Sequence, residues 1–230
     1  MDRDKELKEL FKKADMLFPY QKRREIISRI CEKIYEIDNI EIPPKIQRVA
    51  AKVNRGYFVP EKYLNYAYED TPLPLIKNQT ISAIHMVLIM LTLLNIKKGQ
   101  RILEIGTGSG YNATLLSHLV GKKGEIISIE YFDELYEYAK KRISLLNLGN
   151  VLLIKGDGKK GYPYKKPYDR IISTACAKEI YQAWKDQIDE KKGIILTPIY
   201  YSAFSQMLVK YIKREDRIET YFPVSFVPLL

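Results

Sequence analysis

The chain has 230 residues, 46% of them hydrophobic and 29% charged, which suits one sizeable domain and excludes a disordered protein. No apolar run approaches the roughly 20 residues of a membrane span, and residues 1–5 lack a signal-peptide core, so a soluble, cytoplasmic protein without a membrane partner is predicted. Nucleic acid is not expected as a partner, although the net charge of +10 does not exclude it.

Residues 1–56 are predicted to form an N-terminal helical segment that packs on the core or extends it. Apolar residues recur at three- and four-residue spacing over 7–18 and again over 27–37. The two prolines at 43–44 end this pattern and suit the first turn of a third helix. Nothing in this segment has catalytic spacing, so the activity is assigned to residues 57–230.

A polar stretch, Asn78-Gln-Thr-Ile-Ser-Ala-Ile-His-Met86, leads into a strongly apolar helix predicted over residues 83–94. Thr80 and Ser82 are residue types that cap helix N-termini. The simplest role for Ser82 is therefore to cap this helix.

A glycine-rich turn after a short apolar run is the centre of the predicted fold. Residues 101–105 are predicted to form a buried strand, and helical spacing resumes at 112–119. Between them, Gly106, Gly108 and Gly110 allow a sharp turn because no Cβ is in the way. A strand, a glycine turn and a helix start together expose backbone N–H groups that suit a nucleotide-like ligand.

Two carboxylates narrow the choice of ligand. Glu104 lies two residues before the first glycine, and Glu-x-Gly-x-Gly-x-Gly resembles the S-adenosylmethionine loop of Rossmann-type methyltransferases more than the dinucleotide pattern G-x-G-x-x-G. Glu130 ends the next apolar run, about 20 residues on, where a carboxylate accepts hydrogen bonds from ribose hydroxyls. A nicotinamide cofactor and a turn without a ligand remain the alternatives.

The rest of the chain alternates as an open α/β sheet does. Helices are expected between the strands up to the fifth, most clearly over residues 133–146, and the last two strands are joined by a hairpin turn at 214–217. The predicted strands are 101–105, 126–130, 151–154, 170–174, 193–199, 206–212 and 221–227.

Several motifs together resemble the protein-L-isoaspartate O-methyltransferase family, in the family's order and over roughly residues 46 to 230. The resemblance implies an α/β fold of the Rossmann-type methyltransferases: a seven-stranded mixed sheet with helices on both faces, a C-terminal antiparallel hairpin and additional N-terminal helices. The matching stretches are Phe58-Val-Pro60, Gln79-Thr-Ile-Ser-Ala83, His85-Met86, Leu103-Glu-Ile-Gly-Thr-Gly-Ser-Gly-Tyr111, Gly156-Asp-Gly158, Gly161-Tyr162, Pro167-Tyr-Asp-Arg170 and Phe226-Val-Pro-Leu229.

The resemblance also implies the chemistry. S-adenosyl-L-methionine would be the cofactor, and isoaspartyl-containing proteins or peptides would be the substrates, methylated on the side carboxylate as the first step of repair. That carboxylate has a pKa near ~4, so it is ionised at neutral pH and needs no general base. No metal is required, and the chain has only two histidines.

Residue roles follow from the same resemblance. Ser82 matches the position assigned as the active-site serine, with Thr80 beside it. Because methyl transfer is direct, the Ser82 hydroxyl is expected to orient the attacking carboxylate and not to act as a covalent nucleophile. The expected cofactor contacts are Ile81, Ala83, His85, Glu104, Gly106, Thr107, Gly108, Gly110, Glu130, Tyr131, Asp157, Gly158 and Gln206.

Departures from the family pattern bear on the substrate more than on the cofactor. They include Asn78, Cys176, Lys178, Lys192 and Tyr200. Tyr200 stands where the family has glycine, so it would add bulk near the peptide cleft and would be strained at φ > 0.

Two alternative functions therefore stay open: a relative that methylates RNA or a protein lysine, and a binding module that keeps the fold without turnover. The basic charge would suit RNA. The Lys-, Ile- and Tyr-rich composition is typical of a thermophile. The oligomeric state is left open.

Overall fold

The computed structural model describes residues 3–202 and 204–230. The first two residues of the predicted N-terminal segment, and Ala203 in the stretch after Tyr200, lie outside the described residues.

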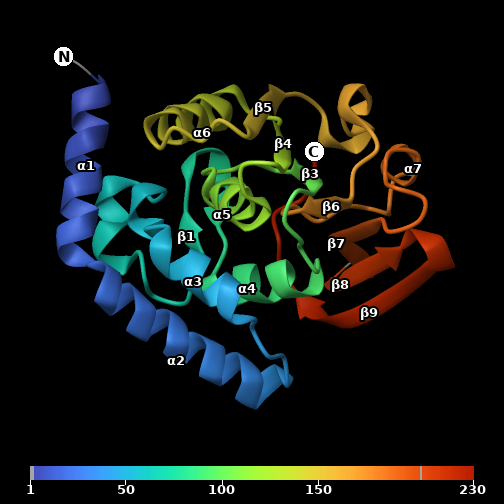
Figure 1. The fold of residues 1–230 in the computed structure, drawn as a ribbon, viewed down its shortest axis with the longest axis horizontal. Coiled ribbons are helices and arrows are strands. Elements are labelled where there is room, and N and C mark those ends of the chain that lie inside the picture. Colours follow the sequence, from blue (N-terminus) through green and yellow to red (C-terminus); the bar gives the residue numbers. More distant parts are fainter. Residues whose placement is uncertain (1–2, 203) are drawn as a thin grey trace.

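One seven-stranded sheet forms the centre of the fold (Figure 1). Its strands are β3 (Arg101–Ile105), β4 (Glu125–Glu130), β5 (Val151–Lys155), β6 (Arg170–Ser173), β7 (Ile194–Ser202), β8 (Ser205–Ile212) and β9 (Arg217–Val224). They are arranged in the order β5-β4-β3-β6-β7-β8-β9, parallel from β5 to β7 and antiparallel from β7 to β9. The predicted seven-stranded mixed sheet and its C-terminal hairpin are confirmed.

The helices confirm most of the predicted pattern. They are α1 (Arg3–Leu17), α2 (Tyr20–Asp38), α3 (Pro44–Lys52), α4 (Ile84–Leu93), α5 (Tyr111–Val120), α6 (Asp133–Leu145) and α7 (Gln182–Lys185). One expectation is wrong: no α-helix connects β5 to β6, where two short 3₁₀ turns stand at Gly158–Lys160 and Pro163–Lys165. Glycine and proline are frequent in this connection, and both residue types disfavour a continuous helix.

Period-two alternation along the parallel strands divides the core between two faces. Ile102 and Ile126 belong to one large apolar cluster with α4, α5 and the N-terminal helices. Leu103 and Ile127 point the other way, into a cluster with Trp184 from α7. The sheet is therefore covered on both faces, as the parallel strands require.

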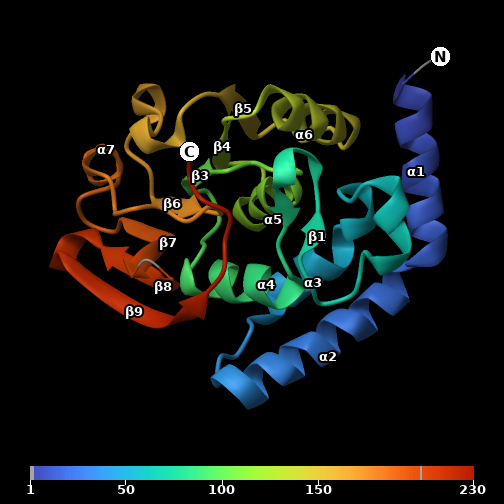
Figure 2. The ribbon, with the colours of Figure 1, turned by 180° about the vertical axis from the view of Figure 1, so that it is seen from behind.

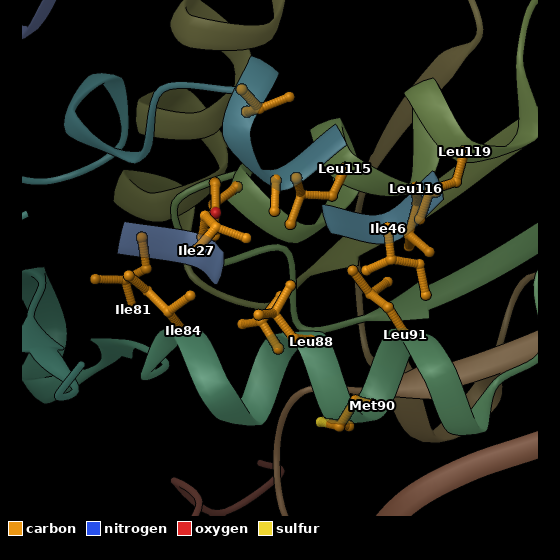
Figure 3. Close-up of a cluster of buried hydrophobic side chains, with 14 of the residues drawn as sticks. Ile27, Ile46, Ile81, Ile84, Leu88, Met90, Leu91, Leu115, Leu116 and Leu119 are labelled. Atoms are coloured by element: carbon orange, nitrogen blue, oxygen red, sulfur yellow. The ribbon is translucent and has the colours of Figure 1, made fainter. Parts of the chain in front are cut away.

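Helix α4 is buried on nearly all sides, which explains its uniformly apolar sequence. Figure 3 shows Leu88 and Leu91 pointing toward Leu115 and Leu116 of α5, while Met90 points to the opposite side of the helix. This packing fixes the start of α4, and the residues before it, against the centre of the sheet.

A second, two-stranded sheet precedes α4. It pairs β1 (Leu73–Pro74) with β2 (Thr80–Ile81) in antiparallel register. Figure 2 shows the chain after β9 crossing in front of the main sheet to end beside β3. Both segments thereby come to the edge where β3 ends.

The sequence predicts neither a membrane span nor a metal site. No helix in the described part of the chain is long and apolar enough to cross a membrane. Across residues 3–202 and 204–230, no group of potential ligands is placed to hold a metal ion. Cys31 and Cys176 are both unpaired and buried.

Candidate active site

The site lies at the carboxyl ends of β3 and β6. β3 is hydrogen-bonded to β4 on one side and β6 on the other. The chain therefore builds the sheet outward from β3 to β4 and β5, and then returns to add β6 on the opposite side of β3. Such a switch point opens a crevice beyond the strand ends, where ligands bind in open α/β sheets. The glycine turn follows β3, and Thr174 follows β6.

The glycine turn has a conformation that side chains would disturb. Gly106, Gly108 and Gly110 have φ angles of 89°, 56° and 86°, in the left-handed region. A Cβ on Gly106 would lie 2.6 Å from Oγ1 of Thr174, whereas one on Gly108 would meet nothing closer than 4.0 Å. The turn is held from below by the Ile129 carbonyl, which accepts hydrogen bonds from the backbone N–H groups of Gly106 and Thr107.

Glu130 connects this turn to the next strand. Its Oε2 accepts from the Gly108 N–H at 2.8 Å, and its Oε1 accepts from the N–H groups of Tyr131 and Phe132 at 3.0 and 3.1 Å. Burial raises the pKa of Glu130, while these backbone donors act in the opposite direction. The carboxylate is therefore fixed at the rim of the crevice with acceptor capacity to spare.

Three cavities meet at this edge. The first is the expected cofactor crevice; it includes Thr80, Gly106, Gly108, Glu130, Tyr131 and Gly158 among the predicted residues. The second, of about 410 Å³, is lined by Thr80, Ser82, Ala83 and His85 and by the wall of residues 223–227. The third is smaller and lined in part by Ile81, Ser82, Thr107 and Asn112.

Thr80 and Thr174 line all three cavities. They mark the point at which a ligand in the glycine crevice would meet one in the 410 Å³ cavity. The sequence predicts Thr80 but not Thr174. Thr174 directly follows β6, a strand that neighbours β3. This position indicates a site residue only once the strand order is known.

Glu104 lies beneath the glycine turn and lines none of these cavities. It is fully buried; Ser128 donates a hydrogen bond to its Oε2, and the Asn112 side chain donates to its Oε1 at 2.8 Å. Burial raises the pKa of Glu104 to about 7. Glu104 therefore supports the turn from below, and its hydrogen-bond partner Asn112 lines the third cavity.

Three further predicted cofactor residues also stand outside the cavity linings. Gly110 precedes α5, and a Cβ there would lie 3.3 Å from Ala139. Asp157 accepts from the Lys159 N–H at 2.9 Å, which is the role of an ordinary turn aspartate. The Gln206 amide binds both the N–H and the carbonyl of Phe226, at 2.7 and 3.0 Å, and so fastens the wall of the second cavity.

Ser82 does not cap α4, contrary to the simplest expectation. Ala83 occupies the N-cap position and makes no side-chain cap. Asp70 supplies the cap instead, since its Oδ1 accepts from the His85 N–H at 2.8 Å. The Ser82 hydroxyl is therefore not committed to the helix and is half-buried against the second and third cavities.

The positions that depart from the family pattern fit the fold. Tyr200 lies within β7 without a positive φ and lines none of the three cavities, so it blocks none of them. Asn78 has a φ of 55°, a conformation that asparagine tolerates better than most residues. The backbone N–H of Cys176 donates to the Val227 carbonyl and so holds the C-terminal segment. Lys192 forms an ion pair with Asp169 at 2.7 Å, and Lys178 is exposed.

Comparisons with known proteins point to one family. The family model for protein-L-isoaspartate(D-aspartate) O-methyltransferase matches residues 31–230. A protein-L-isoaspartate O-methyltransferase of Ignicoccus hospitalis is 42% identical over 212 residues, covering 91% of this chain and 98% of the relative.

Two solved structures are similar to the whole fold. A protein-L-isoaspartate O-methyltransferase superposes with a TM-score of 0.80 at 28% identity, over 90% of this chain and 65% of that one. A Plasmodium falciparum protein assigned the same activity, in complex with S-adenosyl-L-homocysteine, gives a TM-score of 0.75 at 25% identity, over 88% of this chain and 97% of that one.

Proposed function

Since the chain belongs to the protein-L-isoaspartate O-methyltransferase family, we propose that it transfers a methyl group from S-adenosyl-L-methionine to the side carboxylate of L-isoaspartyl residues and so initiates protein repair. One observation carries the proposal at the level of residues. The glycine crevice and the 410 Å³ cavity beside Ser82 share Thr80 and Thr174 in their linings. A donor in the crevice and a peptide acceptor in the cavity would therefore lie next to each other at these two residues.

The residues that line the crevice suit the cofactor. When bound, S-adenosyl-L-methionine supplies a methyl group on a positively charged sulfur. Glu130, at the rim, is placed to accept from the ribose hydroxyls, and Gly106 and Gly108 leave room for the nucleoside above the turn. Tyr131 and Gly158 border the outer part of the crevice, where the adenine would lie. Asp157 is assigned to the adenine only by the family resemblance.

The acceptor side works by placement. An ionised carboxylate is already a nucleophile, so Ser82 and Thr80 need only orient it toward the donor and hold it there. Positioning of this kind accounts for about 7–11 kcal/mol of barrier lowering in well-oriented reactions. Glu104, Ser128 and Asn112 act one layer below by keeping the turn and the start of α5 in place.

The boundaries of the working unit are part of the proposal. We assign catalysis to residues 57–230 and a packing role to residues 1–56, whose helices share the core of α4 and α5. The family match begins at residue 31, inside α2. We also propose a cytoplasmic location, which the composition of the chain favours.

A paired-peptide assay tests the function. The protein is incubated with methyl-labelled S-adenosyl-L-methionine and either an isoaspartyl peptide or its aspartyl twin. Transfer to the isoaspartyl form alone supports the proposal. Transfer to RNA or to lysine side chains, or cofactor binding without transfer to any acceptor, would contradict it.

A further inference from the structure

His85 borders the second cavity, beside Ser82, but the steps of the proposed reaction do not use it. It lies one helical turn after Ser82, at the start of α4, and lines the same 410 Å³ cavity. Its side chain is 40% exposed, so a ligand in that cavity can reach it. It lines this cavity and not the glycine crevice, although the resemblance places it among the expected cofactor contacts.

Asp70 fixes the imidazole ring of His85. Its Oδ1 accepts from the His85 backbone N–H at 2.8 Å and lies 3.0 Å from ring Nδ1. With Nδ1 engaged, Nε2 is left as the ring's other polar atom, and it has no hydrogen-bond partner among the described residues. The hydrogen bond to Asp70 also raises the pKa of His85, against the effect of burial. The contact with Asp70 thus favours the protonated imidazole of His85, in which Nε2 carries a second N–H donor.

Arg55 ties the same loop to Ser82. It is fully buried, and its guanidinium donates to the carbonyls of Ala67, Thr71 and Ser82, the last at 3.0 Å. No carboxylate in the described part of the chain forms an ion pair with Arg55, and Asp70 offsets its charge only at longer range. Its Nε is buried without a partner.

The charges around the cavity are therefore unequal. Protonated His85 lines the cavity, and Arg55 lies behind Ser82 without lining it; together they contribute two positive charges, against one negative charge on Asp70. Asp38, at the end of α2, acts on His85 only through space, and the opposite wall, residues 223–227, has no titratable side chain. A buried positive excess favours an anionic ligand, because the low local dielectric strengthens the interaction.

We propose that His85 recognises the carboxylate of the acceptor through its free ring nitrogen, and that Asp70 and Arg55 are positioning residues that hold His85 and Ser82 toward it. The inference rests on the proposed function and adds a reason for its specificity. A lysine ammonium would be repelled by this arrangement, and a neutral base would gain nothing from it. Because the carboxylate loses its charge during methyl transfer, His85 contributes mainly to binding the substrate.

The first experiment removes the ring. His85→Gln is compared with the wild type for binding S-adenosyl-L-homocysteine and, with that ligand present, for binding two peptides: the isoaspartyl peptide and the same peptide with the free carboxylate as a carboxamide. A hydrogen bond to a charged group contributes enough for a loss of about tenfold or more. We expect that loss, in Kd and KM, for the isoaspartyl peptide alone. His118→Gln on α5 is the matched control, with unchanged affinities.

The second experiment removes only the negative charge of Asp70, which raises the pKa of the His85 ring. Asp70→Asn keeps an oxygen that can accept from the His85 N–H, so the start of α4 is preserved. The protonated ring is the binding form, so the wild-type KM rises as the pH is raised through the pKa of His85, above its ordinary 6.5. In Asp70→Asn the same rise occurs at lower pH.

The outcomes separate the inference from the function it rests on. Unchanged isoaspartyl affinity in His85→Gln, an equal loss for both peptides, or an unshifted pH profile in Asp70→Asn would overturn the role of His85 while leaving the activity in place. If the wild type neither binds nor methylates the isoaspartyl peptide, the proposed function fails and this inference fails with it.

Discussion

Replacing Glu130 by glutamine keeps the shape of the side chain and removes its charge at the rim of the cofactor crevice. In the structure the carboxylate receives three backbone N–H donors and retains room for a ribose hydroxyl. A hydrogen bond to a charged acceptor contributes about 1.5–3 kcal/mol, which corresponds to roughly 10- to 150-fold in affinity. We expect Glu130→Gln to weaken S-adenosyl-L-homocysteine binding by an amount in this range, measured by calorimetry.

The same substitution also disturbs the glycine turn, because Gly108 donates to this carboxylate. The two effects are separated by a second ligand that lacks the ribose hydroxyls, in a double-mutant cycle. If Glu130 holds the ribose, the variant loses much less affinity for the deoxy ligand than for the parent. Glu125→Gln, at the start of the same strand, is the control; its carboxylate pairs with Arg101 and Lys165 away from the crevice.

Equal losses for both ligands would show that Glu130 only supports the turn. Unchanged affinity for the parent ligand would refute the ribose assignment altogether.

Three further predictions concern the acceptor side, the buried acid and the departure at the β7–β8 hairpin. Ser82→Ala should lower kcat by about tenfold or more and leave the affinity for S-adenosyl-L-homocysteine unchanged, because the hydroxyl orients the acceptor. Burial raises the pKa of Glu104 from 4.5 to about 7, so ionising it costs folding free energy. The unfolding free energy of the wild type should therefore fall relative to Glu104→Gln by about 3 kcal/mol between these two pH values, as denaturant titrations would measure. Tyr200→Gly should change kcat/KM for a short isoaspartyl peptide by less than about threefold, because Tyr200 lines none of the three cavities.

Each of these has a clear opposing result. Full activity in Ser82→Ala would leave the hydroxyl without a catalytic role. A pH-independent stability difference for Glu104→Gln would mean that the carboxyl titrates normally in the folded protein. A large gain in activity for Tyr200→Gly would show that the tyrosine restricts the peptide cleft after all.

The local elements were readable from the sequence because their signals are local. The run before Gly106 has the apolar character of a buried strand, the spaced glycines permit left-handed backbone, and helical periodicity resumes at once. Strand, turn and helix are found where predicted, and the predicted N-terminal helices are present as α1, α2 and α3. The connection from β5 to β6 departs from the alternating pattern because its glycine and proline residues disfavour a continuous helix.

The tertiary structure decided which distant residues share the site. Thr174 comes next to the glycine turn because β6 pairs with β3, and the C-terminal residues join the crevice because the chain recrosses the sheet after β9. It also placed Glu104 beneath the turn, since alternate residues of a buried strand point to opposite faces. Spacing along a chain specifies the geometry of neighbours, but strand order and side-chain direction depend on how the whole apolar surface is buried, and no single segment contains that information.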